Sequence, residues 1–228
     1  VIHYDIPKSL EGYYQETGRA GRDGGEGRCI AFYSHKDLQK LEKFMEGKPV
    51  AEQDIGRQLL KETAAYAESS VCRRKLLLHY FGEEYTHDNC GNCDNCLTPQ
   101  TKVEAKDQLC NALEVILACK ENFTDDYIRD ILQGKKTEEV TAHKHDQLEL
   151  FGCGEDESEQ LWNAVLRQAV IAGYLRKDVE NYGVLKVTEK GHKFLEEPTS
   201  FEIVEDRDFD DTENEVPMQS GGACAVDP

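Results

Sequence analysis

Four cysteines are spaced as metal ligands. Cys90, Cys93 and Cys96 follow the pattern C-x2-C-x2-C, and Cys72 lies 18 positions earlier on a predicted helix. Four thiolates suit a closed tetrahedral zinc site, which leaves no coordination position for a reacting water. An iron–sulfur cluster is the main alternative, because this spacing also begins the bacterial ferredoxin run, and thiols without metal are a third. The run lacks its fourth cysteine and its proline here, so we predict one structural Zn²⁺ per chain.

Two arginines stand on a glycine-rich stretch, YYQETGRAGRDGG, at positions 13–25. Taken alone, Arg19 and Arg22 would belong to a solvated turn or to a salt bridge at an interface. The functional alternative is that the glycines let the backbone approach a nucleotide, so that a guanidinium meets charge developing on its γ-phosphate. The sequence holds no phosphate loop of the form G-x-x-x-x-G-K-[ST] and no D-E-x-H. An arginine in this role would therefore act on a phosphate held by another domain.

The chain has 228 residues and a formal net charge of −18, which is unevenly distributed. Residues 201–228 hold nine acidic side chains and one basic side chain, a net of −8, which is typical of a disordered linker. No apolar run approaches the roughly 20 residues that span a bilayer, and there is no signal peptide, so we expect no membrane contact. The chain starts in the strand-like VIHYDI without a methionine, and we expect it to belong to a larger protein.

The elements that must position these groups change along the chain. Residues 1–48 alternate strand and helix, as at the edge of an α/β sheet, and Ser9 is the expected N-cap of the first helix. Residues 49–100 hold two helical segments and the cysteine loop, and residues 101–198 hold short helices and a hairpin. The predicted fold is therefore multidomain: an α/β edge, an α-helical zinc-binding subdomain, a winged-helix α+β domain and an acidic disordered tail over 199–228.

Three stretches make the sequence similar to a known family. QETGRAGRDG resembles the last motor motif of the RecQ-family DNA helicases, and CRRKLLLHYFGE with the cysteines resembles their zinc subdomain. HDQLELFGCGEDESEQLWNAVLRQAVIAGYL resembles their winged helix. The resemblance covers about residues 1–197. It implies an ATP-dependent enzyme that unwinds DNA from 3′ to 5′ in recombination, replication, repair and the SOS response, and a cytoplasmic location at the bacterial nucleoid.

The resemblance also implies roles for three residues of the motif QETGRAGRDG. Arg22 matches the arginine finger, Arg19 matches its companion at the phosphate, and Gln15 opens the motif. ATP and Mg²⁺ would be bound only in the full-length enzyme, against a first motor lobe that carries the phosphate loop. The expected partners are that lobe, single-stranded DNA and duplex junctions, and a single-stranded DNA-binding protein. We expect this chain alone to hydrolyse no ATP.

In the predicted winged helix, the helical segment SEQLWNAVLRQAVIAGYL, residues 158–175, would be the second helix of a helix-turn-helix pair and would approach DNA. Asp156 and Glu159 fit a capping box at its start. Trp162 is expected in the core rather than on the surface as a base-stacking platform. The residues expected to form the buried stripe of this helix are Leu161, Trp162, Val165, Leu166 and Ala169.

The candidate DNA contacts are Arg167 and Gln168 on that helix and Lys177 and Tyr182 on the hairpin. Several acidic residues crowd the start of the helix, which weakens the expected attraction to phosphates. Tyr182 could contact DNA or act as a wedge between strands, although the hairpin is short. The rival to a helicase segment is a non-catalytic zinc and winged-helix module for protein contact or transcriptional regulation, which would have no use for the motif at 15–24.

Overall fold

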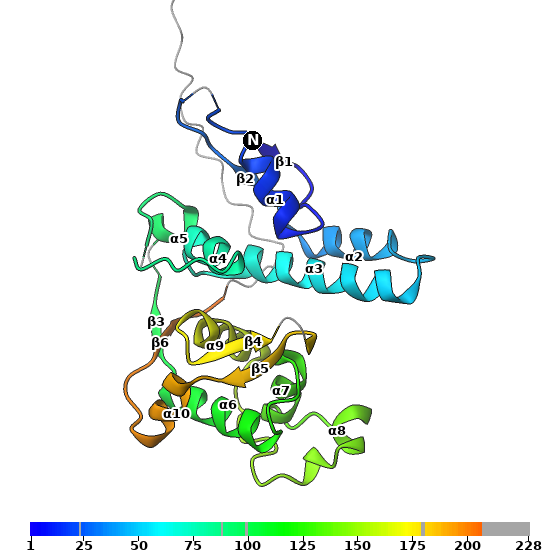
Figure 1. Cartoon of the computed structure of the whole chain (residues 1–228), viewed down its shortest axis with the longest axis vertical. Helices are drawn as coiled ribbons and strands as arrows, with labels where there is room; N and C mark the ends of the chain where they lie inside the picture. The colour runs from blue at the N-terminus through cyan, green and yellow to red at the C-terminus, as the bar shows by residue number, and fades with distance from the viewer. Residues whose placement is uncertain (23, 88, 99, 179–180, 207–228) are drawn as a thin grey trace, which may run out of the picture.

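The computed structural model describes residues 1–206 except positions 23, 88, 99, 179 and 180. Three layers follow one another along its longest axis (Figure 1). A small unit with α1, β1 and β2 lies at one end, a layer with the long helix α3 lies in the middle, and the winged-helix domain lies at the other end. None of the described helices is both long and apolar enough to cross a membrane.

The N-terminal unit is built on a short parallel strand pair. Ile2 of β1 pairs with Ile30 of β2, and each strand has two residues, fewer than the sequence pattern predicts. The side chain of Ser9 accepts a hydrogen bond from the amide of Gly12 at 3.2 Å, so the predicted N-cap of α1 is confirmed. The elements of this unit are β1 (Ile2–His3), α1 (Leu10–Thr17), β2 (Ile30–Ala31) and α2 (His35–Lys43).

The middle layer is the helical part of the zinc subdomain, the name we keep for residues 49–100. Its helices are α3 (Val50–Glu68), α4 (Arg73–Tyr80) and α5 (Asp94–Leu97). The sequence pattern placed Cys72 inside a helix, whereas it is the residue that precedes α4. The segment between α4 and α5 forms a loop that carries two of the other cysteines.

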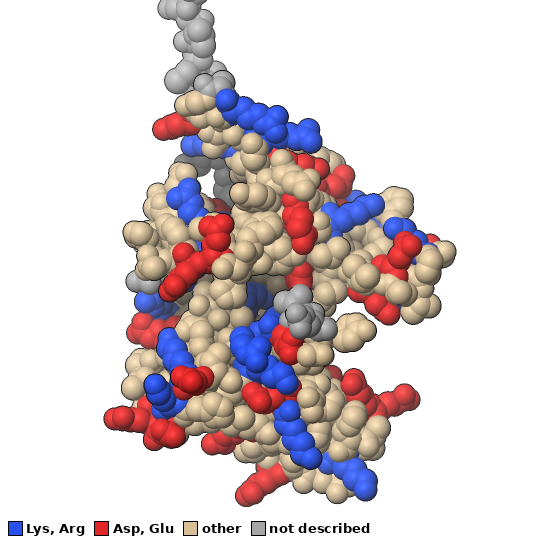
Figure 2. Space-filling view, viewed as in Figure 1, with Lys and Arg blue, Asp and Glu red and all other residues tan. Residues whose placement is uncertain are grey.

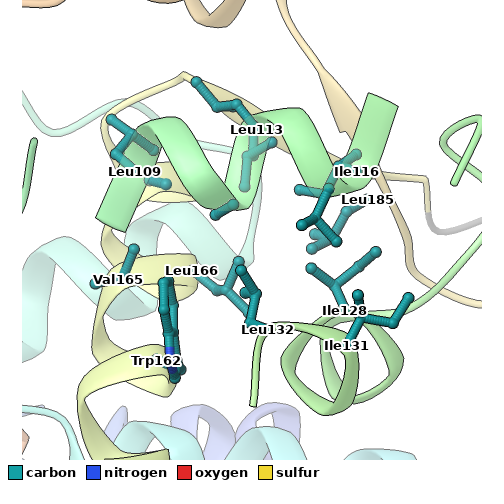
Figure 3. Close-up of a cluster of buried hydrophobic side chains, with 14 of the residues drawn as sticks. Leu109, Leu113, Ile116, Ile128, Ile131, Leu132, Trp162, Val165, Leu166 and Leu185 are labelled. Atoms are coloured by element: carbon teal, nitrogen blue, oxygen red, sulfur yellow. The ribbon is translucent and has the colours of Figure 1, made fainter. Parts of the chain in front are cut away.

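The winged-helix domain surrounds a single apolar core between three helices and a hairpin (Figure 3). Trp162 is fully buried and its Nε1 donates a hydrogen bond to the carbonyl of Gly154 at 3.0 Å, so its predicted place in the core is confirmed. Each fully buried leucine or isoleucine of this core contributes about 2 kcal/mol. The elements are α6 (Lys106–Ala118), α7 (Asp125–Leu132), α8 (Glu138–Ala142), α9 (Glu159–Ile171), β4 (Leu175–Asp178), β5 (Val184–Val187) and α10 (Glu189–Glu196).

Three sequence predictions for this domain were wrong or incomplete. Helix α9 is capped by Ser158, whose hydroxyl accepts from the amide of Leu161, and not by Asp156. A hydroxyl at this position is a better-placed acceptor for the first free amides than a carboxylate two residues earlier. Helices α8 and α10, which have five and eight residues, were missed.

The first residues of the predicted acidic tail are folded. Strand β3 (Lys102–Glu104) pairs antiparallel with β6 (Glu202–Val204), with Val103 opposite Ile203. Phe201 and Ile203 are buried against the winged-helix core, which outweighs the acidic composition of this stretch. The prediction of an unstructured segment is therefore wrong for residues 201–206. The part of the predicted tail at 207–228 lies outside the described residues.

Candidate zinc centre, arginine loop and DNA surface

The structure brings the four predicted cysteines together. The sulfur atoms of Cys72, Cys90, Cys93 and Cys96 all lie within 4.8 Å of one another, and no other such group of three or more metal-binding side chains occurs among the described residues. The amide of Cys93 donates to the sulfur of Cys90 at 3.4 Å, and that of Cys90 donates to Cys96 at 3.3 Å. Gly91 has a φ of 63°, a backbone conformation that lets the loop turn its sulfurs inward. This donor set suits a tetrahedral metal ion and leaves no position for chemistry.

Backbone contacts make one of the four thiols, that of Cys90, easier to ionise, whereas burial raises the pKa of Cys72 and Cys96. Burial by itself would raise the pKa of Cys90, but the amides of Asn92 and Cys93 donate to its sulfur and bring the pKa to about 7. A thiol with that pKa is readily deprotonated when a metal ion binds to its sulfur.

A buried amide side chain holds the cysteine loop against the middle layer. The Nδ2 atom of Asn95 donates to the carbonyls of Ser69 and Val71, each at 2.7 Å, and Asn95 is only 3 % exposed. Because Val71 precedes the ligand Cys72, this contact fixes one ligand-bearing segment relative to the other. The zinc loop is thus positioned by hydrogen bonds to the turn between α3 and α4.

The arginine loop, the name we use for residues 18–29 between α1 and β2, faces solvent. Gln15, Arg19 and Arg22 are all exposed, and neither guanidinium forms a hydrogen bond or ion pair with another described residue. Gly21 has a φ of 72°, and a Cβ atom there would come within 2.8 Å of the carbonyl oxygen of Gly25. The loop therefore needs glycine at this position, and it leaves two unpaired guanidiniums available to a ligand.

Two of the predicted DNA contacts are engaged within the fold instead. The Nη1 atom of Arg167 lies 2.6 Å from Oδ2 of Asp206, and these side chains are 19 % and 6 % exposed. The side-chain amide of Gln168 bonds both backbone groups of Val204. Its Nε2 atom donates to the carbonyl of Val204 at 2.7 Å, and its Oε1 atom accepts from the backbone N–H of Val204 at 3.1 Å. These contacts attach the end of β6 and Asp206 to α9, which contradicts the expectation that the two side chains face DNA.

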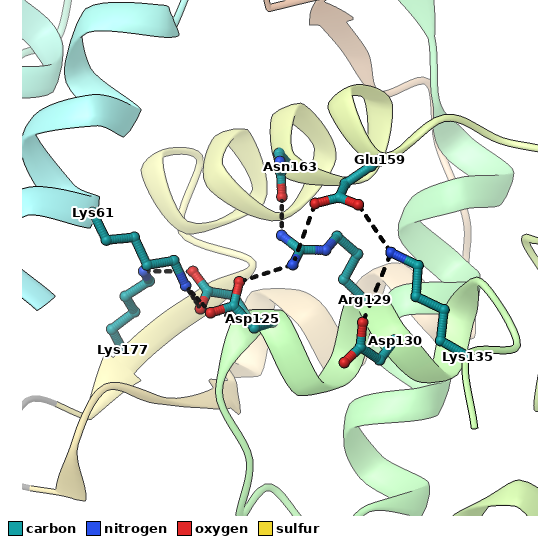
Figure 4. A network of polar contacts seen from close by, with 9 residues as sticks. Lys61, Asp125, Arg129, Asp130, Lys135, Glu159, Asn163 and Lys177 are labelled. Atoms are coloured by element: carbon teal, nitrogen blue, oxygen red, sulfur yellow. Dashed lines mark hydrogen bonds and ion pairs between the residues drawn. The ribbon is translucent and has the colours of Figure 1, made fainter. Parts of the chain in front are cut away.

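Lys177 is also directed toward the protein. Its ammonium lies 2.9 Å from Oδ2 of Asp125, whose other oxygen is 2.9 Å from the ammonium of Lys61 in α3 (Figure 4). Burial by itself would raise the pKa of Asp125, but the two lysines outweigh burial and hold it well below its usual range. Lys61 also bonds Asp126, so an ion-pair network joins the zinc subdomain to the winged-helix domain.

The network continues across the winged-helix domain. Arg129 lies 2.7 Å from Oδ1 of Asn163 and 3.5 Å from Glu159, and Lys135 lies 2.9 Å from Glu159 (Figure 4). These contacts join α7 to α9. Beside them, a cavity of about 260 Å³ lies between the helices of the zinc subdomain and those of the winged-helix domain.

The hairpin presents a basic outer face that the sequence analysis missed. Arg176 and Lys186 are opposite each other in the β4–β5 register, while their neighbour Leu185 is buried on the other face. Arg176 is exposed and forms no hydrogen bond or ion pair with another described residue, and Tyr182 at the turn is 92 % exposed with a φ of 56°. Lys and Arg side chains gather over this region of the domain in Figure 2. Arg176 directly follows Leu175 and Lys186 directly follows Leu185, and this one-residue offset from an apolar position is the signal that could have revealed the face.

Comparison with known families matches two regions of the chain. A family described as "RQC domain" matches residues 99–212, and one described as "RecQ zinc-binding" matches residues 35–97. The chain belongs to the RecQ family. Within this RecQ chain, the match at 35–97 includes all four clustered cysteines, so the cluster is a structural zinc site and the iron–sulfur alternative is set aside.

Relatives from bacteria and eukaryotes are similar to most of this RecQ chain. "ATP-dependent DNA helicase RecQ" of Pasteurella multocida (strain Pm70) is 34 % identical over 204 residues, which cover 88 % of the chain and 32 % of the relative. "RecQ-like DNA helicase blm-1" of Caenorhabditis elegans is 36 % identical over 193 residues, covering 78 % of the chain and 20 % of the relative. "ATP-dependent DNA helicase hus2/rqh1" of Schizosaccharomyces pombe (strain 972 / ATCC 24843) is 37 % identical over 180 residues, covering 75 % and 14 %. The chain spans about a third or less of the length of these relatives.

Proposed function

We propose that the chain works as the C-terminal part of an ATP-dependent DNA helicase that unwinds DNA from 3′ to 5′. The observation that carries this proposal is the arginine loop, in which two exposed guanidiniums follow α1 with no partner among the described residues. The names of the relatives, which are ATP-dependent DNA helicases, support the same reading. The protein would act on DNA at the nucleoid, with a single-stranded DNA-binding protein as a further partner.

In this function, the arginine loop would complete an ATP site that another domain begins. Arg22 would reach the γ-phosphate as the arginine finger, and Arg19 would contact phosphate beside it. A guanidinium suits this role, because it is always charged and its planar fork matches the phosphate oxygens. Gln15, at the start of the motif, would help to place the nucleotide. When bound, Mg²⁺ and ATP would supply the charged phosphates on which these side chains act.

The exposed strand pair of the N-terminal unit supports the proposal that a further part of the protein packs beside this site. Ile2, Ile30 and Phe32 are exposed at 69 %, 46 % and 53 %, although they belong to or follow parallel strands. Parallel sheets occur almost only where both faces are covered. We therefore propose that residues 1–48 form the edge of a larger α/β motor lobe, whose remaining strands would extend this sheet and whose helices would cover these side chains.

DNA would contact the outer face of the hairpin rather than helix α9. Arg176 is available for phosphates there and Tyr182 projects from the turn, whereas the ammonium of Lys186 donates to the carbonyl of Glu121 at 2.6 Å. A wedge role for Tyr182 would place its ring against the terminal base pair at a junction. Arg176 and Tyr182 lie on one hairpin, so they can meet the same stretch of DNA backbone.

The test is a set of arginine substitutions in the full-length protein. Arg22→Ala should lower ATP turnover by about 10³- to 10⁵-fold. The dissociation constant for ATP should change little, because the side chain acts mainly on charge that develops in the transition state. Arg28→Ala, in the same loop but outside the motif, is the matched control. Loss of ATP affinity in proportion to rate would make Arg22 a ground-state clamp, and a full-length protein without DNA-stimulated turnover or unwinding would refute the helicase proposal.

A further inference from the structure

We propose that the zinc subdomain holds the arginine loop in position, and that Arg73 is the positioning residue that joins the two. The inference rests on the proposed function in one respect, because it takes Arg19 and Arg22 to act at a nucleotide. The chain of contacts that carries it is independent of that function. It runs from the zinc ligands through Arg73 and Tyr66 to Tyr13 of α1.

At the zinc end, Arg73 joins two segments that carry ligands. It directly follows Cys72, and its Nε and Nη2 atoms donate to the two carboxylate oxygens of Asp94 at 3.1 and 3.0 Å. Asp94 directly follows Cys93 and begins α5. A paired contact between guanidinium and carboxylate fixes orientation as well as distance. The position of the Arg73 side chain therefore depends on a correctly folded cysteine loop.

The same guanidinium closes the end of helix α3. Its Nη1 atom donates to the carbonyl of Tyr66 and, at 3.1 Å, to the carbonyl of Ala67. The last carbonyls of a helix have no partner within the helix, so this contact satisfies groups that would otherwise be left unpaired. The guanidinium also lies over the ring of Tyr66, 5.4 Å from its centroid. Arg73 thus holds the Tyr66 ring through both its backbone and its π-face.

Tyr66 in turn supports helix α1. Its ring centroid is 5.5 Å from that of Tyr13, which lies in the middle of α1. A second contact supports the start of the helix, where the hydroxyl of Tyr80 donates to Oε1 of Glu11 at 2.6 Å. Tyr80 is the last residue of α4, the helix that begins after the ligand Cys72. Both ends of α4 therefore lie in the path from zinc to α1.

The arginine loop leaves α1 directly. The helix ends at Thr17, and the amide of Arg19 still bonds the carbonyl of Glu16 at 3.2 Å. A tilt of α1 on its support would consequently displace both arginines. A displacement of about 1 Å at a catalytic group can cost on the order of 10²-fold in rate.

The first experiment measures hydrogen exchange in the 228-residue chain by mass spectrometry. In Arg73→Ala, peptides within 10–20 should exchange roughly tenfold faster, because local opening of α1 becomes easier. Peptides of the winged-helix core should be unchanged, and one zinc per chain should remain. Arg74→Ala is the matched control, since that arginine is exposed and forms no hydrogen bond or ion pair with another described residue. Arg73→Lys should restore little, because an ammonium cannot form the paired contact.

A second variant keeps the test valid if Arg73→Ala loses its zinc. Tyr66→Leu removes the ring between Arg73 and Tyr13 without touching a ligand, and it should give the same faster exchange within 10–20 with zinc retained. Unchanged exchange within 10–20 in Tyr66→Leu would overturn the proposal, as would an equal increase over the whole chain.

The second experiment measures ATP turnover in the full-length protein. Arg73→Ala should lower kcat about tenfold or more while KM for ATP changes less than about twofold, because the arginines would be misplaced only for the transition state. If Arg22→Ala keeps full turnover, the proposed function fails while the exchange result stands. If Arg22→Ala abolishes turnover but Arg73→Ala changes neither exchange nor kcat, the positioning role fails while the function stands.

Discussion

Removing Arg167 should destabilise the winged-helix domain and leave DNA binding unchanged. In Arg167→Ala the carboxylate of Asp206, which is 6 % exposed, loses the guanidinium 2.6 Å away. Removing one partner of a fully buried pair costs about 3–5 kcal/mol, and the 19 % exposure of Arg167 reduces this to about 2–3 kcal/mol. The melting temperature of the domain should fall by roughly 10 °C, as measured by calorimetry.

Arg176→Ala is the matched control with the opposite expectation. Arg176 is exposed on the hairpin and forms no hydrogen bond or ion pair with another described residue, so its loss should change stability by less than about 0.5 kcal/mol. Its loss should instead weaken DNA binding, measured by fluorescence anisotropy well below the melting temperature. The reasoning is refuted if Arg167→Ala keeps the melting temperature and loses DNA affinity as Arg176→Ala does.

The pH dependence of Arg167→Ala gives a further check on the cause. Burial raises the pKa of Asp206, and Arg167 only partly offsets it. Without Arg167 the folded pKa rises further above the unfolded value, so the folded state binds the proton more tightly than the unfolded state does. The deficit in stability should therefore be smallest below about pH 4, where Asp206 is protonated, and should grow as pH rises toward 7. A deficit that does not vary with pH would point to lost packing instead.

Three further predictions concern the zinc site, the DNA surface and the contact between domains. Purified chain should contain one zinc ion, and Cys93→Ser or chelation should unfold residues 51–98, because the binding energy of a structural site is folding energy; a brown, zinc-free preparation would contradict this. DNA affinity should fall steeply with salt, and Arg176→Ala should reduce the slope of log affinity against log salt by about 1, since each phosphate contact releases about one counterion; an unchanged slope would exclude a phosphate contact by Arg176. Lys61 and Lys177 hold the pKa of Asp125 below its unfolded value, so the contribution of Asp125 to stability is complete above about pH 4 and is lost as pH falls further. Asp125→Asn should remove this acid dependence, as measured by urea unfolding at each pH.

Local patterns in the sequence predicted the parts of the site that local chemistry determines. The spacing of Cys90, Cys93 and Cys96 limits how their sulfurs can be arranged, so the metal loop could be recognised without a structure. The glycines around Arg19 and Arg22 likewise mark a loop, because glycine adopts backbone conformations that other residues rarely reach. Helical periodicity also identified the buried stripe of α9, because apolar residues that recur at helical spacing must share one face.

Contacts between distant segments were beyond such patterns. The pairing of β3 with β6 joins strands about 100 residues apart in the sequence, and the alternation of Phe201 and Ile203 was hidden in an acidic stretch. The same return of the chain gave Arg167 its partner Asp206, and so turned a predicted DNA contact into a structural one. A cation on a helix looks the same in the sequence whether it meets a phosphate or a carboxylate.

The support of the arginine loop was decided at the same level. The sequence determined that Tyr13 lies on a helix and that Arg73 follows a zinc ligand, since both depend on neighbouring residues. Only the tertiary structure placed Tyr66 between them, because its ring reaches both neighbours from the last turns of a separate helix. Residue types and spacing thus determined which groups can act, and packing between helices decided which of them meet.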